Sequence, residues 1–320
     1  MSEIAAEPRV CILTSQYFGW GKIGGFGSMS RALAESLAAR GVPVSVVVPR
    51  RPGQPEHEFQ NGVHVYSFRP LDLPHGRRLI RDCHANVFHS QDPTFLTTLA
   101  RWLRPDAVHV VTCRDPRDTR DWLVEFRDAT WGRRFKIPLN WTLEASPLVG
   151  WAVRGADGVY TPAYFLQDKV RRIFRPKADV GLLPNLIDVP HTLPEKPATP
   201  VLTFIGRLDH RKRPEIFFEL ARALPDYRFQ VVGKAESEER DRSLRHTYGA
   251  LENVDWVGYL DRFQDPGAMR KVLADTWVLV NTASREGLPL TFLEAAGYGC
   301  AIVSAVNPDD FAARFGRHVE

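Results

Sequence analysis

Short apolar segments alternate with amphipathic segments along the chain, and this alternation restricts the fold more than any other feature. Residues 10–17, VCILTSQY, are typical of a buried parallel strand, and a glycine-rich loop follows them. Next come an amphipathic segment, with Ser28 expected to cap its start, and an apolar run at 42–49. Parallel strands are apolar because helices cover both faces of their sheet. The order strand, loop, helix, strand therefore predicts a doubly wound α/β sheet.

The same alternation ends near residue 190 and begins again at residue 201. The segment between them is rich in proline, which interrupts helices and sheets and stiffens a linker. A chain of 320 residues is long enough for two hydrophobic cores. We therefore predict a Rossmann-like domain at 1–190, a linker at 191–200 and a second Rossmann-like domain at 201–320.

The bulk composition favours a globular protein of the cytoplasm. The four cysteines are scattered without metal-ligand spacing, which favours a reducing compartment over a disulfide framework. The N-terminal segment lacks the apolar core of a signal peptide, and no apolar run reaches the ~20 residues that span a bilayer. The net charge of +4 permits an anionic ligand or a membrane surface but demands neither, and we expect no nucleic-acid partner.

The segment SREGLPLTFLE, residues 284–294, holds two glutamates around the expected start of a helix. Acidic residues near a helix start are favoured by its dipole and need no function. However, this helix follows a buried strand, and open α/β sheets bind ligands at the carboxyl ends of their strands. Free backbone N–H groups there favour a phosphate, and carboxylates accept hydrogen bonds from hydroxyl groups. Glu286 and Glu294 therefore indicate a nucleotide sugar as ligand.

The segment IGRLDHRKRP follows another expected strand and holds Arg207 and Lys212. A basic loop is often only a solvated surface. At the carboxyl end of a strand of the same sheet, however, these cations can face the same crevice as the glutamates. Arginine offers a planar fork for phosphate oxygens, and lysine offers a point charge. We therefore expect Arg207 and Lys212 to bind a diphosphate.

Together these segments resemble the family 4 retaining glycosyltransferases, which have the GT-B fold. Glu286 and Glu294, with seven residues between them, resemble the family's E-x7-E motif, and GRLDHRK resembles its Gly-Arg…Lys segment. GKIGGFGS, PNLID and VDWVGYL are similar to the family's glycine-rich loop, interdomain segment and base-pocket segment. The resemblance implies two Rossmann-like domains that face each other across a cleft. It also implies transfer of a sugar from a nucleoside-diphosphate sugar to an acceptor, with retention of anomeric configuration.

The resemblance implies a role for each matching residue. Arg207 and Lys212 would bind the donor diphosphate and, with Glu286, would form the catalytic set. Glu286 would accept hydrogen bonds from the transferred sugar, and Glu294 from the ribose. The other expected contacts with the nucleotide sugar are Gly24, Gly25, Tyr259, Gly287, Leu288 and Leu290. We expect no metal and no cofactor, because two cations and helix N–H groups can stabilise the leaving diphosphate.

The chain departs from the family in two places. Where the family often has His-Asp after a strand of its first domain, this chain has Arg114 and Asp115. Arg114 is expected either to contact an acidic sugar or acceptor, or to pair with Asp115 or Asp118 and only shape the loop. His89, at another strand end, is a second possible sugar or acceptor contact, although a lone histidine is more often structural. The chain also ends at FGRHVE, before the family's last β/α units, so we expect a C-terminally truncated second domain.

Two other functions stay open on the sequence alone. Gly19, Gly21 and Gly24 spell G-x-G-x-x-G after a strand, as in an NADP-dependent Rossmann oxidoreductase, although a helix that starts near Ser28 would place the last glycine outside it. The replaced histidine and the short second domain would also suit a non-catalytic protein that binds nucleotide sugars. The acceptor, whether glycan, lipid or small molecule, is not indicated. The basic, aromatic stretches 131–136 and 170–177 are either solvated faces or contacts with an anionic acceptor or the inner face of a membrane.

Overall fold

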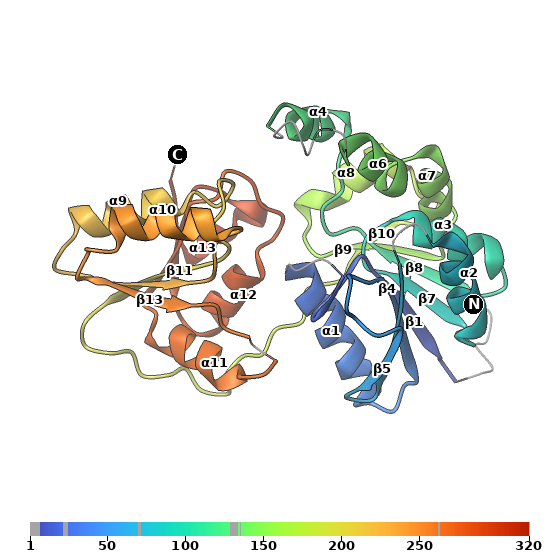
Figure 1. Cartoon of the computed structure of the whole chain (residues 1–320), viewed down its shortest axis with the longest axis horizontal. Helices are drawn as coiled ribbons and strands as arrows, with labels where there is room; N and C mark the ends of the chain where they lie inside the picture. The colour runs from blue at the N-terminus through green and yellow to red at the C-terminus, as the bar shows by residue number, and fades with distance from the viewer. Residues whose placement is uncertain are drawn as a thin grey trace. The chain divides into compact units, whose positions relative to one another are not determined.

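The computed structural model describes residues 7–21, 25–69, 72–128, 134, 136–261 and 263–319. The chain divides into two compact units, one ending at Leu186 and the other beginning at Ile187 (Figure 1). The sequence-predicted linker at 191–200 contacts the second unit. Lys196 donates to the carbonyl oxygens of Thr276 and Leu273 at 2.6 and 3.1 Å, and the indole N–H of Trp277 donates to the carbonyl oxygen of Pro197 at 2.8 Å.

The first unit is built on an eight-stranded sheet with the order β10-β9-β8-β7-β1-β4-β6-β5. Every pairing in it is parallel except that of β5 with β6. The strands are β1 (Val10–Leu13), β4 (Val44–Pro49), β5 (His57–Gln60), β6 (Val63–Phe68), β7 (Val87–Ser90), β8 (Val108–Thr112), β9 (Gly158–Thr161) and β10 (Val180–Leu182). A short hairpin, β2 (Gln16–Tyr17) with β3 (Trp20–Gly21), follows β1.

Helices cover both faces of this sheet. They are α1 (Gly25–Ala38), α2 (Leu73–Asp82), α3 (Phe95–Leu103), α4 (Thr119–Asp128), α6 (Lys136–Glu144), α7 (Pro147–Arg154) and α8 (Phe165–Phe174). Successive residues of a strand point to opposite faces, so Ile12 packs in the cluster beneath α1 while Leu13 packs with α2 and α3. The strand order reverses between β1 and β7, which makes the carboxyl ends of these two strands the switch point of the sheet.

The second unit has a six-stranded parallel sheet with the order β13-β12-β11-β14-β15-β16. Its strands are β11 (Val201–Ile205), β12 (Arg228–Val232), β13 (Val254–Gly258), β14 (Val278–Asn281), β15 (Ala301–Ser304) and β16 (Gly316–His318). Its helices are α9 (Pro214–Ala223), α10 (Glu238–Tyr248), α11 (Pro266–Asp275), α12 (Leu290–Gly297), the short η1 (Pro308–Asp310) and α13 (Phe311–Phe315). Here the strand order reverses between β11 and β14.

The apolar sequence of these strands is explained by burial on two sides. Val231 and Val232, neighbours on β12, face opposite clusters. One cluster contains Phe217 of α9 with residues of α10, and the other contains Phe292 of α12 with residues of α11 and α13. Each such side chain contributes roughly 1.5–3 kcal/mol when fully buried, so neither face can be left open. The predicted fold class, two doubly wound α/β sheets, is confirmed.

The start of the first long helix was predicted wrongly. Helix α1 begins at Gly25, so Ser28 lies inside the helix, where it is buried, and does not cap it. Because the described helix already includes Gly25, a helix start near Ser28 no longer argues against a G-x-G-x-x-G reading of Gly19, Gly21 and Gly24. Gly24 itself lies outside the described residues, as does most of the basic stretch 131–136. Within the described ranges, no helix is long and apolar enough to cross a membrane.

The chain just before the division between the units and the chain just after it contact different parts of the protein. Asn185 accepts a hydrogen bond from the guanidinium of Arg114, which is buried in the first unit. On the other side, Ile187 and Val189 lie against Gly297 of α12, where an added Cβ would sit 2.4 Å from Cγ1 of Val189. Asp188 adds an ion pair with Arg270 at 2.5 Å. Because both partners of that pair are exposed, it contributes little to stability.

Candidate functional site

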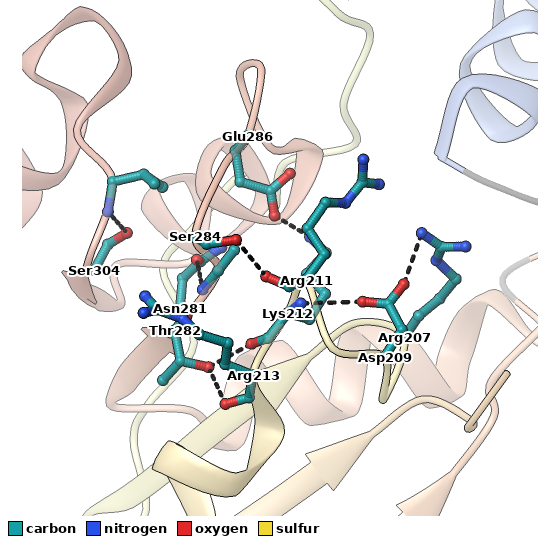
Figure 2. Close-up of polar contacts among 12 residues, drawn as sticks. Arg207, Asp209, Arg211, Lys212, Arg213, Asn281, Thr282, Ser284, Glu286 and Ser304 are labelled. Carbon is teal, nitrogen blue, oxygen red and sulfur yellow. Dashed lines mark hydrogen bonds and ion pairs between the residues drawn. The ribbon is translucent and has the colours of Figure 1, made fainter. Parts of the chain in front are cut away.

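The switch point of the second unit brings the sequence-predicted cations and one glutamate together. Arg207 and Lys212 lie in the loop between β11 and α9, and Glu286 lies in the loop between β14 and α12. The two strands are paired neighbours, but α9 and α12 cover opposite faces of the sheet. The backbones of the two loops therefore turn toward opposite faces at the carboxyl edge of the sheet. Side chains from both loops contact each other at this edge (Figure 2).

A buried carboxylate, Asp209, organises the first loop. Its Oδ1 accepts the backbone N–H of Lys212 at 3.0 Å, and its Oδ2 lies 2.8 Å from the guanidinium of Arg207. Asp209 is buried, whereas the Arg207 side chain is half exposed. One carboxylate thus fixes the backbone under Lys212 and the direction of Arg207, while leaving much of the guanidinium open to a ligand.

Lys212 and Glu286 form an ion pair in the ligand-free site. The Nζ of Lys212 donates to Oε1 of Glu286, and both side chains are largely buried, with 18% and 14% of their surface exposed. An unpaired charge at such a position would be costly, so the pairing offsets the cost of burying both groups. The sequence predicted both residues as site residues but gave no sign that they would contact each other.

Direct hydrogen bonds hold the two loops in register. The hydroxyl of Thr282 donates toward the carbonyl oxygens of Lys212 and Arg213, at 2.6 and 2.9 Å (Figure 2). The backbone N–H of Ser284 donates to the carbonyl oxygen of Arg211 at 3.0 Å. The sequence analysis missed Asp209, Thr282 and Arg213. Asp209 carries a weak signal, because it stands between two predicted site residues, whereas nothing in the local sequence marks Thr282.

The neighbouring strands bring further groups to this edge of the sheet. Gly233, after β12, has a φ of 145°, and a Cβ there would lie 1.8 Å from the carbonyl oxygen of Gly206. Only glycine therefore permits this close approach of the two loops. Lys234 places its Nζ 4.8 Å from the ring centroid of Tyr259, the predicted base contact after β13. The Tyr259 side chain is 46% exposed, so the ring is accessible at the same edge.

The remaining predicted residues of the second unit surround the start of α12. Gly287 and Leu288 are partly buried in the loop after Glu286, and Leu290 is the first residue of the helix. Glu294 lies on α12 itself and is buried. In the first unit, Gly25 is the first residue of α1.

His89 and Arg114 belong to a buried polar network at the carboxyl ends of β7 and β8. The guanidinium of Arg114 donates to Oε1 of Gln91 and to Oδ1 of Asn185. With its oxygen toward Arg114, the Gln91 amide turns its nitrogen toward Nε2 of His89, 3.0 Å away. Nε2 must then accept, so the proton of His89 is on Nδ1. Nε2 is also 2.8 Å from the hydroxyl of Thr112.

Burial in this network shifts the pKa values of His89 and Asp92 in opposite directions. Burial, followed by the positive charge of Arg114, lowers the pKa of His89 to about 4, so the ring is neutral at neutral pH. Burial raises the pKa of Asp92 to about 7. Asp92 has a φ of 133°, which is rare outside glycine, and its Oδ1 accepts the backbone N–H of Arg114 at 2.8 Å. The described contacts of the Arg114 guanidinium are with neutral amides rather than with Asp115 or Asp118.

Among the residues that the structure describes, no group of three or more His, Cys, Asp or Glu side chains is placed to hold a metal ion. A narrow pocket lies behind the ion pair of the second unit. Its lining includes Lys212, Asn281, Thr282 and Thr291.

Comparisons with protein families match both units. The family model described as Glycosyltransferase Family 4 matches residues 23–191, more than half of the chain, and the one described as Glycosyl transferases group 1 matches residues 189–309. Among curated proteins, the O-antigen biosynthesis glycosyltransferase WbnH of Escherichia coli is 30% identical over 118 residues. That match spans 35% of this chain and 32% of the relative, so the chain covers about a third of the relative's length.

Solved structures show the same fold at low sequence identity. WaaG, a glycosyltransferase involved in lipopolysaccharide biosynthesis, superposes with a TM-score of 0.69 at 15% identity, covering 97% of this chain and 85% of that one. Anabaena HepE, solved in complex with UDP, superposes with a TM-score of 0.62 at 14% identity, covering 92% and 80%. These neighbours have the GT-B fold, which agrees with two doubly wound sheets in one chain.

The low pKa of His89 should appear in the pH dependence of stability. Between about pH 6.5 and 4 the unfolded chain protonates this histidine while the folded chain does not, so its contribution is lost as the pH falls. His89→Gln removes that contribution. Relative to the wild type, the variant should therefore gain about 2–3 kcal/mol of unfolding free energy between pH 7.5 and pH 4.5. Urea titrations of both proteins at the two pH values measure the unfolding free energies. Asp92 titrates in the opposite sense, but it is present in both proteins, so its contribution cancels in the difference between them. Parallel pH dependence of the two proteins would contradict the assignment.

Proposed function

The chain belongs to glycosyltransferase family 4, and we propose that it transfers a sugar from a nucleoside-diphosphate sugar to an acceptor hydroxyl. One observation carries this proposal: Arg207, Lys212 and Glu286 meet at the switch point of the second sheet, where α/β sheets bind nucleotides. The complex of Anabaena HepE with UDP supports a nucleotide donor. An NADP-dependent oxidoreductase is no longer favoured, because family models of glycosyltransferases match both units.

The chemistry needs positive charge on the leaving group. Breaking the bond between the sugar and the diphosphate builds negative charge on the diphosphate oxygens. Asp209 holds the guanidinium of Arg207 and the backbone N–H of Lys212 before any ligand arrives, so the loop that carries both cations needs little reorganisation as that charge develops. In the free protein these cations are paired with Asp209 and Glu286. Donor binding exchanges those pairings for contacts with phosphate oxygens and frees Glu286 to accept from a sugar hydroxyl.

We assign the remaining contacts along the donor in the same way. Glu294 accepts from the ribose hydroxyls, and Tyr259 lies beside the base. The backbone N–H groups of Gly287, Leu288 and Leu290 face the sugar and phosphate, and Gly24 and Gly25 allow the first unit's backbone to approach the diphosphate. Transfer retains the anomeric configuration and requires no metal: the leaving phosphate takes the acceptor's proton on the same face of the sugar. A protein nucleophile is then unnecessary.

The first unit supplies the acceptor side. His89 and Arg114 form the wall of this region, and the engagement of Arg114 with Gln91 and Asn185 argues for a role in shape rather than in binding a carboxylate. The acceptor is a glycan, a lipid or a small molecule. For a lipid acceptor, the protein lies peripherally on an anionic membrane through the basic residues at 170–177. Arg172 and Arg175 are exposed there, whereas Arg171 is paired with Asp168 at 2.8 Å.

Removing either cation should strongly lower turnover while the fold persists. Lys212→Ala and Arg207→Ala should each lower kcat about 10²–10³-fold, because a donor aimed at developing charge contributes on that scale. The Michaelis constant for the donor should change less. The measurement is hydrolysis of the sugar donor, with water as acceptor, after a thermal-shift panel of UDP, GDP, ADP and their sugars has identified the base. Arg222→Ala, an exposed arginine on α9, is the matched control. Unchanged turnover in Lys212→Ala would refute the proposed function, and a wild type that binds the donor without breaking it would favour a non-catalytic binding protein.

Substitutions at the two glutamates should weaken the binding of different ligands. Glu294→Gln should weaken the free nucleoside diphosphate and the sugar donor alike, because it faces the ribose that both contain. Glu286→Gln should weaken the sugar donor more, because its proposed partner is absent from the free nucleotide. Calorimetric titration of each variant with both ligands measures the difference. Equal losses of free nucleotide in the two variants would show that this division of roles is wrong.

Membrane contact should depend on charge. The wild type should pellet with vesicles that contain anionic phosphatidylglycerol but not with pure phosphatidylcholine vesicles, and raised salt should release it. The double variant Arg172→Glu with Arg175→Glu should stay in the supernatant, whereas Arg222→Glu in the second unit should behave as the wild type. A wild type that fails to pellet on anionic vesicles at low salt would contradict the membrane contact and would leave a soluble acceptor.

A further inference from the structure

Two residues that no recognised motif marks, Thr282 and Arg213, exchange hydrogen bonds beneath the candidate site. The Thr282 hydroxyl donates toward the carbonyl oxygens of Lys212 and Arg213, at 2.6 and 2.9 Å. In return, the Nε–H of Arg213 donates to the carbonyl oxygen of Thr282 at 2.6 Å. Each side chain therefore holds the backbone of the other residue, and the two loops of the site are fastened at one point (Figure 2).

This fastening fixes the backbone on both sides of the Lys212 side chain. Its N–H is held by Oδ1 of Asp209, and its carbonyl oxygen is held by Thr282. Thr282 is buried, so water does not compete for the hydroxyl. With both peptide groups held, the direction in which the Lys212 side chain leaves the loop is set before it meets any partner.

The backbone of Arg213 adopts a strained conformation. Arg213 has a φ of 47°, in the left-handed region that residues other than glycine rarely adopt. It stands immediately before Pro214, the first residue of α9, and its own side chain caps no helix N–H. Such a conformation persists only where the surroundings over-determine it, and the bond from Nε to Thr282 is one of those constraints.

The same fastening sets the spacing between Lys212 and Glu286. Thr282 and Glu286 lie in one loop, and the N–H of Ser284, between them, is tied to the carbonyl oxygen of Arg211 at 3.0 Å. The register of the two loops therefore rests on backbone bonds as well as on the ion pair. This distinction matters, because a substrate that enters between the two charges must open the ion pair.

We propose that Thr282 and Arg213 are positioning residues that keep Lys212 aimed at the leaving diphosphate after its ion pair with Glu286 has opened. The inference rests on the proposed function. Neither residue contacts the reacting atoms: Thr282 acts from beneath, through the backbone of Lys212.

Two substitutions at Thr282 distinguish the proposed hydrogen-bonding role of its hydroxyl from a role in packing alone. Thr282→Val removes the hydroxyl and keeps the shape, whereas Thr282→Ser keeps the hydroxyl. In donor hydrolysis, Thr282→Val should lower kcat about tenfold, equivalent to about 1.4 kcal/mol of transition-state stabilisation. The Michaelis constant for the donor should stay within about twofold, and Thr282→Ser should recover most of the lost kcat. In a protein that already carries Lys212→Ala, Thr282→Val should cause no further loss, because the residue acts through that lysine.

A second buried threonine provides the matched control. Thr276 precedes β14 at the opposite end of the strand, and its hydroxyl donates to the carbonyl oxygen of Val272 at 2.7 Å. The same hydroxyl lies 2.7 Å from the hydroxyl of Thr203, so Thr276→Val removes two buried hydrogen bonds, as Thr282→Val does, and should keep the wild-type kcat. Hydrogen exchange of the free proteins gives a reading that needs no activity: the amides of Lys212 and Arg213 should exchange faster in Thr282→Val only.

The outcomes distinguish this inference from the proposed function. A wild-type kcat in Thr282→Val, an equal loss in the presence of Lys212→Ala, or an equal loss in Thr276→Val would each overturn the positioning role. Unchanged exchange at Lys212 and Arg213 in Thr282→Val would overturn it even if no donor were turned over. A fully active Lys212→Ala would instead overturn the proposed function, and the positioning role would fall with it.

Discussion

The pairing of β11 with β14 is the contact on which the candidate site depends. Leu202 and Thr203 lie opposite Val278 and Leu279, so two strands far apart in the sequence run side by side and end at the same edge. The apolar residues of each strand require a helix on both faces, and the two onward connections take opposite faces. The loops must therefore part at the edge. Neither loop would present a binding surface alone, since the cations come from one and the glutamate from the other.

The charges of this edge are balanced inside the free protein. Each of the two cations, Arg207 and Lys212, has its own carboxylate, and only the pair of Lys212 is largely buried on both sides. The two loops can stay folded without a ligand, because neither Lys212 nor Glu286 is left as an isolated buried charge. Ligand binding requires that the ion pairs of Arg207 and Lys212 open, and contacts with the ligand must be at least as strong as these ion pairs. Phosphate, with several acceptor oxygens and more than one negative charge, can satisfy that condition where a neutral ligand cannot.

The sequence was sufficient for the fold class and for three of the residues that meet in the candidate site, Arg207, Lys212 and Glu286, because both depend on local signals. Apolar runs mark strands, and polar residues directly after a strand must lie at one edge of a parallel sheet. The start of α1 was missed because a serine inside a helix looks like a cap when no partner is visible. The Thr282–Arg213 exchange was missed for a different reason: a bond between a side chain and a distant backbone carbonyl leaves no pattern in either segment. The same holds for the amide network that engages Arg114.

The segment that leaves the first unit leads directly onto the helix of Glu294. Asn185 is bound to the buried Arg114, and two residues later Ile187 and Val189 rest on Gly297, less than one turn of α12 beyond Glu294. Little free chain remains around Leu186. A side chain larger than glycine at position 297 would push Val189 away from the helix, so this one small residue allows the segment after Leu186 to pack against the helix that carries Glu294. The packing of residues 187–189 and the position of the Glu294 side chain therefore depend on the same helix.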